Sequence, residues 1–285
     1  MKKFLFKFLI YSSAVLMIGF ILIPFYNMIL LSITPENIYL REDFILYPKE
    51  VTWDSFKYVF NNSTIWQGLI ITIIVTIVGT IYNLFLTITA AYALNSNFPG
   101  KKLYVGLIFI ALFLDGGLIS NYLLISKIGL IDSIFSMILP TGINIAYLLL
   151  LYKAFGNIPS SVIESARLDG ANDIHILSKI VIPMSKPIIA AIALYYAVER
   201  WNEWYLGMLY INTSSLRPLQ LILKGVVSNV NSIANSELAD NLGIIPFSTG
   251  IKMACTVVTM IPVVLIYPLL QKHFIEGISE GSIKE

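Results

Sequence analysis

The sequence predicts an all-α polytopic membrane protein with six transmembrane helices. Its composition, its long apolar segments and the placement of its basic residues support this prediction. Of its 285 residues, 57% are hydrophobic and 13% are charged, and the mean hydropathy is +0.78. A typical soluble domain has about 25% charged residues, so this chain lacks the polar side chains needed to cover a soluble surface. Lipid is the simplest environment for the surplus apolar surface.

Six segments are apolar over the length of about 20 residues that a membrane crossing requires. We expect spans at Phe8–Ile33, Gly68–Leu94, Leu103–Ile125, Ser136–Phe155, Pro187–Ile211 and Phe247–Leu270. The third is the weakest, because an Asp-Gly-Gly sequence at residues 115–117 interrupts it. The first follows three lysines, as a signal peptide does, but its apolar run is longer than a signal core, so we interpret it as a span.

The basic residues predict the orientation, since cytoplasmic segments of membrane proteins are enriched in Lys and Arg. With both termini inside, the inner segments hold Lys2, Lys3, Lys7, Lys101, Lys102, Lys153, Arg167, Lys179, Lys186, Lys272 and Lys284. The outer segments hold Arg41, Lys49, Lys57, Lys127, Arg217, Lys224 and Lys252, spread over longer loops. We therefore expect one transmembrane domain over residues 1–285, with both termini cytoplasmic, outer loops at 34–67 and 212–246, and an inner loop at 156–186.

Other classes of protein receive little support. The net charge of +2 gives no case for nucleic-acid binding. The single cysteine, Cys255, excludes an intrachain disulfide and a Cys-rich metal site, and we expect no bound metal or cofactor. An enzyme is disfavoured because the chain has no His-Glu-x-x-His motif and its two histidines, His175 and His273, are far apart in the sequence. A secondary transporter would usually carry an internal repeat, and we find none.

The inner loop 156–186 is long for a connection between membrane helices and has the pattern of a folded unit. Ser161 and Glu164 have the spacing of a capping box, so we expect a helix that starts there and runs to Leu168. Asp169-Gly170 then predicts a turn, because glycine accepts the positive φ that often follows a helix.

A second helix is expected from about Asn172 to just before Pro183, which cannot continue a regular helix. In it, Ile174, Leu177 and Val181 recur at helical spacing and form an apolar stripe, to which Ile163 and Ala166 of the first helix add. The stripe fits docking into a groove on a partner protein, and equally fits packing against the ends of this chain's own spans.

The same loop resembles the EAA loop of ABC importer permeases, which reads Glu-Ala-Ala, three residues, Gly, nine residues and Ile-x-Leu-Pro. The resemblance assigns coupling to an ATPase to Glu164, Ser165, Ala166, Asp169, Gly170, Ala171, Ile180 and Pro183. Two positions depart from the pattern, Ser165 in place of Ala and Ile182 in place of Leu, and both substitutions are conservative in size or polarity.

Further segments are similar to carbohydrate permeases, so the resemblance covers nearly the whole chain. They are residues 98–102, 116–122, 129–132 and 267–274, and the tail at 277–285. Together they look like the polysaccharide and lipoprotein-linked branch of the sugar permeases of Gram-positive bacteria. A permease for a non-sugar solute is the alternative.

The resemblance implies a type I ABC importer permease fold in the bacterial plasma membrane. It also implies a second homologous permease, a cytoplasmic ABC ATPase dimer and an extracytoplasmic solute-binding lipoprotein as partners. ATP would be hydrolysed by the ATPase, and this chain has no phosphate-binding Gly-x-x-x-x-Gly-Lys-Ser/Thr loop of its own.

Charged residues inside a span insert at a cost of about 2.5 kcal/mol or more, and they usually face a cavity or one another. The candidate substrate-pathway residues are Glu199, Arg200, Trp201, Asn202, Glu203 and Trp204 in the fifth span and Asp115 in the third. Carboxylates, a guanidinium, an amide and indole rings suit a sugar. The alternative is structural, with Arg200 paired to a neighbouring carboxylate, the tryptophans anchored at the interface and Asp115 in water at a helix end.

Overall fold

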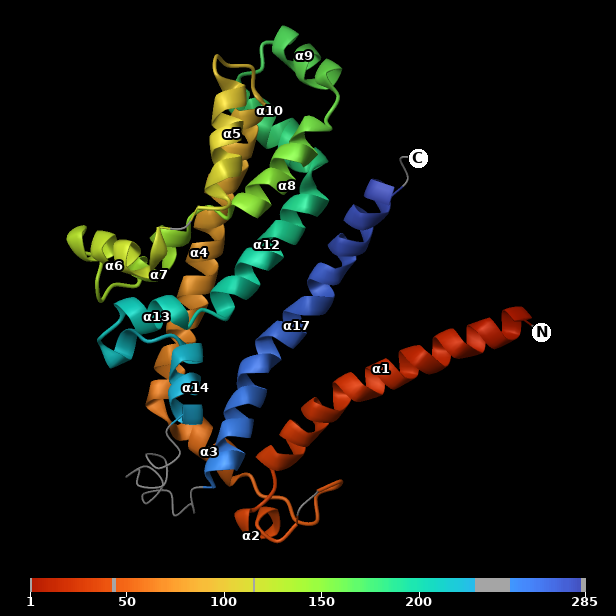
Figure 1. Ribbon diagram of the computed structural model, residues 1–285, viewed down its shortest axis with the longest axis vertical. Coiled ribbons are helices and arrows are strands. Elements are labelled where there is room, and N and C mark those ends of the chain that lie inside the picture. The colour runs from red at the N-terminus through yellow and green to blue at the C-terminus, as the bar shows by residue number, and fades with distance from the viewer. Residues whose placement is uncertain (1, 43–44, 115, 229–246, 283–285) are drawn as a thin grey trace. The chain divides into compact units, whose positions relative to one another are not determined.

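The structure, a computed structural model, describes residues 2–42, 45–114, 116–228 and 247–282 (Figure 1). Within these ranges all regular structure is helical, which confirms the predicted all-α class. The chain forms two compact units, one of residues 1–66 with 222–262 and the other of residues 67–221 with 263–285. Asp115 and residues 229–246 of the second predicted outer loop lie outside the described residues.

The first unit is built mainly on two long helices, α1 (Lys2–Ser32) and the first part of α17 (Ser248–Ser282), with the later part of α14 (Leu219–Ser228). Between α1 and the next long helix lie two short helices, α2 (Glu36–Tyr39) and α3 (Asp54–Asn61). Helix α1 is apolar all round and almost wholly exposed, which is the pattern of a helix surrounded by lipid.

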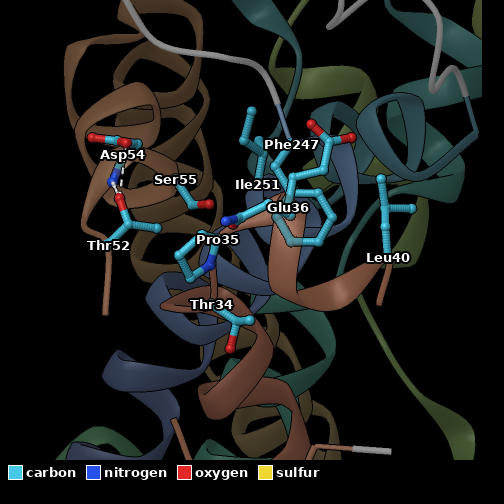
Figure 2. A pocket seen from close by; sticks show the side chains of 10 residues that line it. Thr34, Pro35, Glu36, Leu40, Thr52, Asp54, Ser55, Phe247 and Ile251 are labelled. Atoms are coloured by element: carbon cyan, nitrogen blue, oxygen red, sulfur yellow. Dashed lines mark hydrogen bonds between the residues drawn. The ribbon is translucent and has the colours of Figure 1, made fainter. Parts of the chain in front are cut away.

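The first unit also contains a cavity of about 600 Å³, with side chains of several elements around it (Figure 2). Its lining combines hydroxyl, amide and carboxylate groups with a few apolar side chains. These residues are Thr34, Pro35, Glu36, Asn37, Leu40, Thr52, Asp54, Ser55, Phe247 and Ile251.

The second unit contains most of α4 (Ser63–Asn95) and the helices that follow it. They are α5 (Lys101–Ala111), α6 (Gly117–Lys127), α7 (Phe135–Ile138), the 3₁₀ turn η1 (Leu139–Thr141), α8 (Ile145–Gly156), α9 (Ser160–Leu168), α10 (Asp173–Ile176), the π-helical turn η2 (Leu177–Val181), α11 (Ile182–Met184), α12 (Lys186–Trp201), α13 (Tyr205–Tyr210) and the 3₁₀ turn η3 (Ser214–Leu216). Its core joins α4, α8, α10 and α12 through Ala91, Leu94, Leu148, Leu151, Phe155, Ile176, Val181, Ile192 and Tyr196.

Three described helices are long and apolar enough to cross a membrane: Phe6–Ser32, Ser63–Asn95 and Ser248–Leu265. Two bent helix pairs raise the number to five if each is one span. One joins Phe135–Thr141 to Ile145–Gly156 at 50°, and the other joins Asp173–Met184 to Lys186–Trp201 at 86°. The polytopic class is therefore confirmed, whereas the predicted count of six spans is not.

The predicted third span is the main difference. In place of one helix over Leu103–Ile125, the chain forms α5 and α6 with a break at residues 112–116. Each has 11 residues, about 17 Å of helix, against the roughly 30 Å of a bilayer's hydrocarbon core. Helix α6 starts at Gly117 with a φ of 75°. Residues other than glycine rarely adopt this conformation. The Asp-Gly-Gly sequence that made the third span the least clear in the sequence therefore coincides with the break.

The predicted fourth and fifth spans are broken as well. The fourth is interrupted at residues 142–144, where Asn144 caps α8 by accepting hydrogen bonds from the backbone N–H groups of Ala146 and Tyr147. The fifth ends at Trp201, and its expected continuation to Ile211 is the separate helix α13. The polar cluster at 199–204 therefore sits at the end of α12 and not in the middle of a straight helix.

Candidate functional site

The predicted coupling loop folds into two short helices joined at Gly170, as expected. Helix α9 ends at Leu168, and Gly170 has a φ of 82°. The N–H of Ala171 donates to the carbonyl of Ala166 at 3.0 Å, and the N–H of Gly170 donates to the carbonyl of Arg167 at 3.0 Å. These two bonds define a Schellman motif, which satisfies the last free carbonyls of a helix and requires a left-handed residue at the position of Gly170.

The predicted capping box at the start of α9 is wrong. The helix begins at Ser160, its N-cap is Pro159, and no side chain caps it. Pro159 has a φ of −57° and an extended ψ and takes the N-cap position, so the helix starts two residues earlier than it would with Ser161 as the N-cap. Glu164 consequently lies beyond the first turn and cannot reach the N-cap.

Glu164 instead lines a small cavity of about 170 Å³ where the loop meets the ends of α4 and α8. Arg167 and Asn95 line the same cavity. Asp173 links the loop to α4, because its Oδ1 accepts hydrogen bonds from the Tyr92 hydroxyl at 3.0 Å and from Arg167 Nη2 at 3.1 Å. Both short helices of the loop are thereby tied to the end of a long membrane helix.

The second helix begins as predicted, since Asn172 caps it by accepting a hydrogen bond from the N–H of His175 at 2.8 Å. The prediction that it ends before Pro183 is wrong, because helical structure continues to Met184. The π-helical turn at Leu177–Val181 explains this. A π turn is wider than an α turn, so it relieves the clash between a proline ring and the carbonyl four residues before it.

The apolar residues of the loop divide between its own core and the surface. Ile163, Ala166, Leu177 and Val181 pack on the core of the second unit, so the self-packing alternative holds for most of the stripe. Ile174, in contrast, is 78% exposed, and Leu168 at the end of α9 is 90% exposed. The exposure of Leu168 was not predicted from the sequence. The adjacent Asp-Gly turn could have indicated it, because turns lie at the surface.

The remaining residues of the motif are distributed over both faces of the loop. Ser165, Asp169 and Gly170 are exposed beside Leu168, Ala171 and Ile180 are half-buried, and Pro183 is exposed. The structure thus presents one continuous exposed edge around the α9–α10 turn.

Arg200, predicted as a pathway residue, is buried and acts as a structural link. Its guanidinium donates from Nη1 to the carbonyl of Met137 at 2.7 Å and from Nη2 to the carbonyl of Thr141 at 3.0 Å. It also bonds the Thr141 hydroxyl and, at 3.3 Å, the Oδ1 of Asn83 on α4. These hydrogen-bond partners are all uncharged, so they, and not the carboxylate considered in the structural alternative, fix the position of the Arg200 guanidinium.

Three other members of the cluster also make contacts within the fold. Glu203 Oε1 accepts a hydrogen bond from the N–H of Leu206 at 2.8 Å, at the start of α13. Trp201 is buried at the end of α12. The ring of Trp204 meets the ring of Tyr205 edge-on, with centroids 5.7 Å apart.

The exposed side of α12 carries a different set of groups, Tyr195, Glu199 and Asn202, which recur at helical spacing. Glu199 Oε1 accepts a hydrogen bond from the Tyr147 hydroxyl of α8 at 2.5 Å. The rings of Tyr147 and Tyr195 stack with centroids 5.5 Å apart and an angle of 14°. Tyr147 was not predicted, because only the folded chain brings α8 beside α12.

These features define a class of protein before any comparison: a multi-pass membrane protein with a folded loop between two membrane helices and a polar, aromatic surface on one of them. Residues 84–280 match the family described as "Binding-protein-dependent transport system inner membrane component". The chain belongs to this family and is an ABC importer permease.

Known relatives agree with this assignment. The polygalacturonan/rhamnogalacturonan transport system permease protein YtcP of Bacillus subtilis (strain 168) is 37% identical over 285 residues, which is the whole of both chains. Protein LplC of the same bacterium is 36% identical over 265 residues, 92% of this chain and 89% of LplC. A chain in the crystal structure of a bacterial ABC transporter involved in the import of the acidic polysaccharide alginate matches with a TM-score of 0.85 and 29% identity, covering 93% of this chain and 95% of that one.

Proposed function

We propose that this permease imports a sugar or oligosaccharide, with a second permease completing the pathway. An extracytoplasmic binding lipoprotein delivers the substrate, and a cytoplasmic ATPase dimer hydrolyses ATP, which this chain does not bind. The similarity to YtcP over the whole of both chains carries this proposal, together with the alginate importer as structural neighbour.

The exposed side of α12 is the surface we assign to the pathway. Glu199 is exposed on a helix of a candidate span, and a carboxylate facing hydrocarbon would be costly, so this side faces a cavity or the partner permease. A carboxylate, an amide and stacked tyrosine rings supply hydrogen bonds and apolar faces, which together suit a pyranose ring.

The α9–α10 turn is the surface we assign to the ATPase. Its exposed Leu168 and Ile174 flank the Schellman turn at Gly170, and apolar side chains outside lipid are suited to a groove on a partner. This assignment requires the loop to be cytoplasmic. A cysteine replacing Glu42 should therefore react with an impermeant thiol reagent in intact cells, whereas one replacing Ser161 should not. Labelling of Ser161→Cys without labelling of Glu42→Cys would show that the chain has the opposite orientation in the membrane.

The substrate is tested with the transporter reconstituted from all of its subunits in proteoliposomes. We expect saccharide-loaded binding protein to stimulate ATP hydrolysis and uptake, and Glu199→Gln to reduce uptake while the complex stays assembled. Glu50→Gln, a neutralised carboxylate in the outer loop, is the control. Stimulation by amino acids or phosphate, with none by any saccharide, would reject the sugar assignment.

A further inference from the structure

Helix α3 carries three different faces, one buried, one polar and one aromatic. Ser55, Tyr58 and Val59 form the buried face, and Ser55 also lines the cavity of the first unit (Figure 2). Asp54 and Lys57 pair on a polar face, with Lys57 Nζ 3.0 Å from Asp54 Oδ1. The third face is aromatic.

The aromatic face forms a continuous row of rings from the start of α3 to the start of α4. Trp53 and Phe56 have ring centroids 5.7 Å apart, Phe56 and Phe60 6.4 Å, and Phe60 and Trp66 6.2 Å. Exposure is 59% for Trp53, 51% for Phe60 and 45% for Trp66. We call Trp53, Phe56, Phe60 and Trp66 the aromatic row.

The row is fixed at the junction of the two helices. The indole N–H of Trp66 donates to the carbonyl of Phe60 at 2.7 Å, which satisfies one of the last carbonyls of α3. Asn62 Oδ1 accepts a hydrogen bond from the N–H of Thr64 at 3.0 Å and so caps the start of α4. The rings are therefore held in place and are not a set of independent surface side chains.

The position of Trp66 places the row at a membrane boundary. Trp66 lies in the first turn of α4, a candidate span of 33 residues. At 1.5 Å per residue this helix is about 50 Å long, longer than the roughly 30 Å hydrocarbon core, so its ends extend into the headgroup layers. The aromatic row thus ends in the first turn of a candidate span.

We propose that α3 lies in the membrane–water interface, with the aromatic row inserted among the lipid headgroups and upper acyl chains. Tryptophan is enriched at this depth, and short amphipathic helices bind there through aromatic and aliphatic faces. The polar face with Lys57 and Asp54 then points to water. Anchoring one face of α3 in lipid sets the position of its buried face, and hence of one wall of the cavity.

A carbohydrate platform is the rival occupant for a row of aromatic rings. The ring planes disfavour it, because neighbours along the row are inclined by 50°, 24° and 33° and offer no common flat surface. Two of the four rings are phenylalanines, which bring no polar group to bond a hydroxyl.

The test places a nitroxide label on either of two faces of the same helix. Phe60→Cys and Lys57→Cys are made in a Cys255→Ser background, labelled, and reconstituted with the assembled transporter in phosphatidylethanolamine/phosphatidylglycerol vesicles. Relaxation by oxygen, which concentrates in lipid, is compared with relaxation by a water-soluble nickel chelate. We expect oxygen to dominate at position 60 and nickel at position 57. Nickel dominating at both positions would overturn the proposal.

A second measurement uses one member of the aromatic row as its own probe. Trp53 becomes the only tryptophan when Trp66, Trp201 and Trp204 are replaced by phenylalanine, and its fluorescence is read in vesicles with brominated acyl chains. We expect strong quenching by bromines near the headgroup end of the chain and weak quenching by bromines near its methyl end. Quenching by aqueous iodide without quenching by bromolipid would place Trp53 in water. An emission shift caused only by galacturonan or alginate oligosaccharides would assign the row to carbohydrate instead.

Discussion

Tyr196 and Arg200, one turn apart on α12, bond to opposite sides of the break in the predicted fourth span. The hydroxyl of Tyr196 accepts a hydrogen bond at 3.0 Å from the N–H of Asn144, the last residue of the break, and shares a bond of 2.8 Å with the hydroxyl of Thr87. Arg200 bonds the carbonyls of Met137 and Thr141, before the break. Backbone groups in a membrane must be satisfied by protein, so these two side chains permit the irregular segment at this position.

Replacing Arg200 should therefore lower stability before it alters transport. Arg200→Met leaves the carbonyls of Met137 and Thr141 without this donor, and each buried unsatisfied group is worth about 1–3 kcal/mol. Thermal unfolding in detergent should show a lower midpoint temperature. Co-purification should show reduced assembly with the partner subunits. Asn202→Ala, on the exposed side of the same helix, is the matched control and should unfold like the wild type. An unchanged midpoint for Arg200→Met would refute the structural role.

The exposed side of α12 should behave in the opposite way. Glu199→Ala, Asn202→Ala and Tyr147→Phe remove groups from the surface that we assign to the pathway, so we expect impaired uptake or altered saccharide preference with near-normal thermal stability. Trp201→Ala is a poor probe of the pathway, since Trp201 is buried and its truncation leaves a void. If all three variants take up every saccharide normally, this surface does not line the pathway and instead faces lipid or makes a structural contact.

The sequence predicted local features well where one residue determines the backbone. Asp169-Gly170 predicted the turn, and Asn172 predicted the cap of α10, because a positive φ and an N-cap depend on the residue in place. The same local reasoning failed at Ser161, because the N-cap of α9 is Pro159, two residues earlier.

Features that depend on distant residues could not be predicted. A hydropathy window averages over some twenty residues, so it joined α5 to α6 and α12 to α13 across their breaks. The sequence left Arg200 between a pathway role and a structural one, because its acceptors, the carbonyls of Met137 and Thr141, belong to another span and have no signature in the sequence. The same holds for Tyr147, whose bond to Glu199 exists only after α8 has packed on α12.

Asp132 should make the two turns that it joins, at residues 132 and 212–213 of the second unit, sensitive to acid. Its carboxylate accepts hydrogen bonds from the hydroxyl of Thr213 at 2.6 Å and from the backbone N–H groups of Thr213 and Asn212. These bonds, led by the one from the Thr213 hydroxyl, lower the pKa of Asp132 below its usual value.

A carboxyl whose pKa is lower in the folded state contributes its full stability above the unfolded pKa of about 3.9 and loses it as the pH falls through the folded pKa. We expect Asp132→Asn to flatten the acid side of the stability profile measured by thermal unfolding. Asparagine tolerates the φ of 61° at this position, so the change isolates the charge. A variant with the same acid sensitivity as the wild type would show that Asp132 is not the responsible group.

Gly170 should affect coupling more than folding. A Cβ at Gly170 would have no atom within 4 Å, so Gly170→Ala meets only the backbone penalty of a positive φ, about 1–2 kcal/mol. Gly129, with a φ of 73° and equally open surroundings, is a matched control in the predicted outer part of the chain. We expect Gly170→Asp to abolish uptake and reduce co-purification of the ATPase, while the permease stays in the membrane with its partner permease. Equal losses for Gly129→Asp would attribute the effect to backbone strain.

The two exposed apolar side chains beside that turn give the most direct test of ATPase docking. Leu168 and Ile174 are 90% and 78% exposed, so Leu168→Ser and Ile174→Ser remove almost nothing from the core of the permease. Burying one such side chain in a groove is worth about 1.5–3 kcal/mol, so each change should weaken docking about tenfold or more. The ATPase is diluted at a fixed salt concentration, and the amount of it that stays bound to the purified permease is measured. Leu46→Ser alters an equally apolar residue, 65% exposed in the first unit, and should retain the ATPase fully. If Leu168→Ser and Ile174→Ser also retain it fully and transport normally, both side chains stay uncovered in the assembled transporter, and ATPase docking must depend on the polar part of the loop.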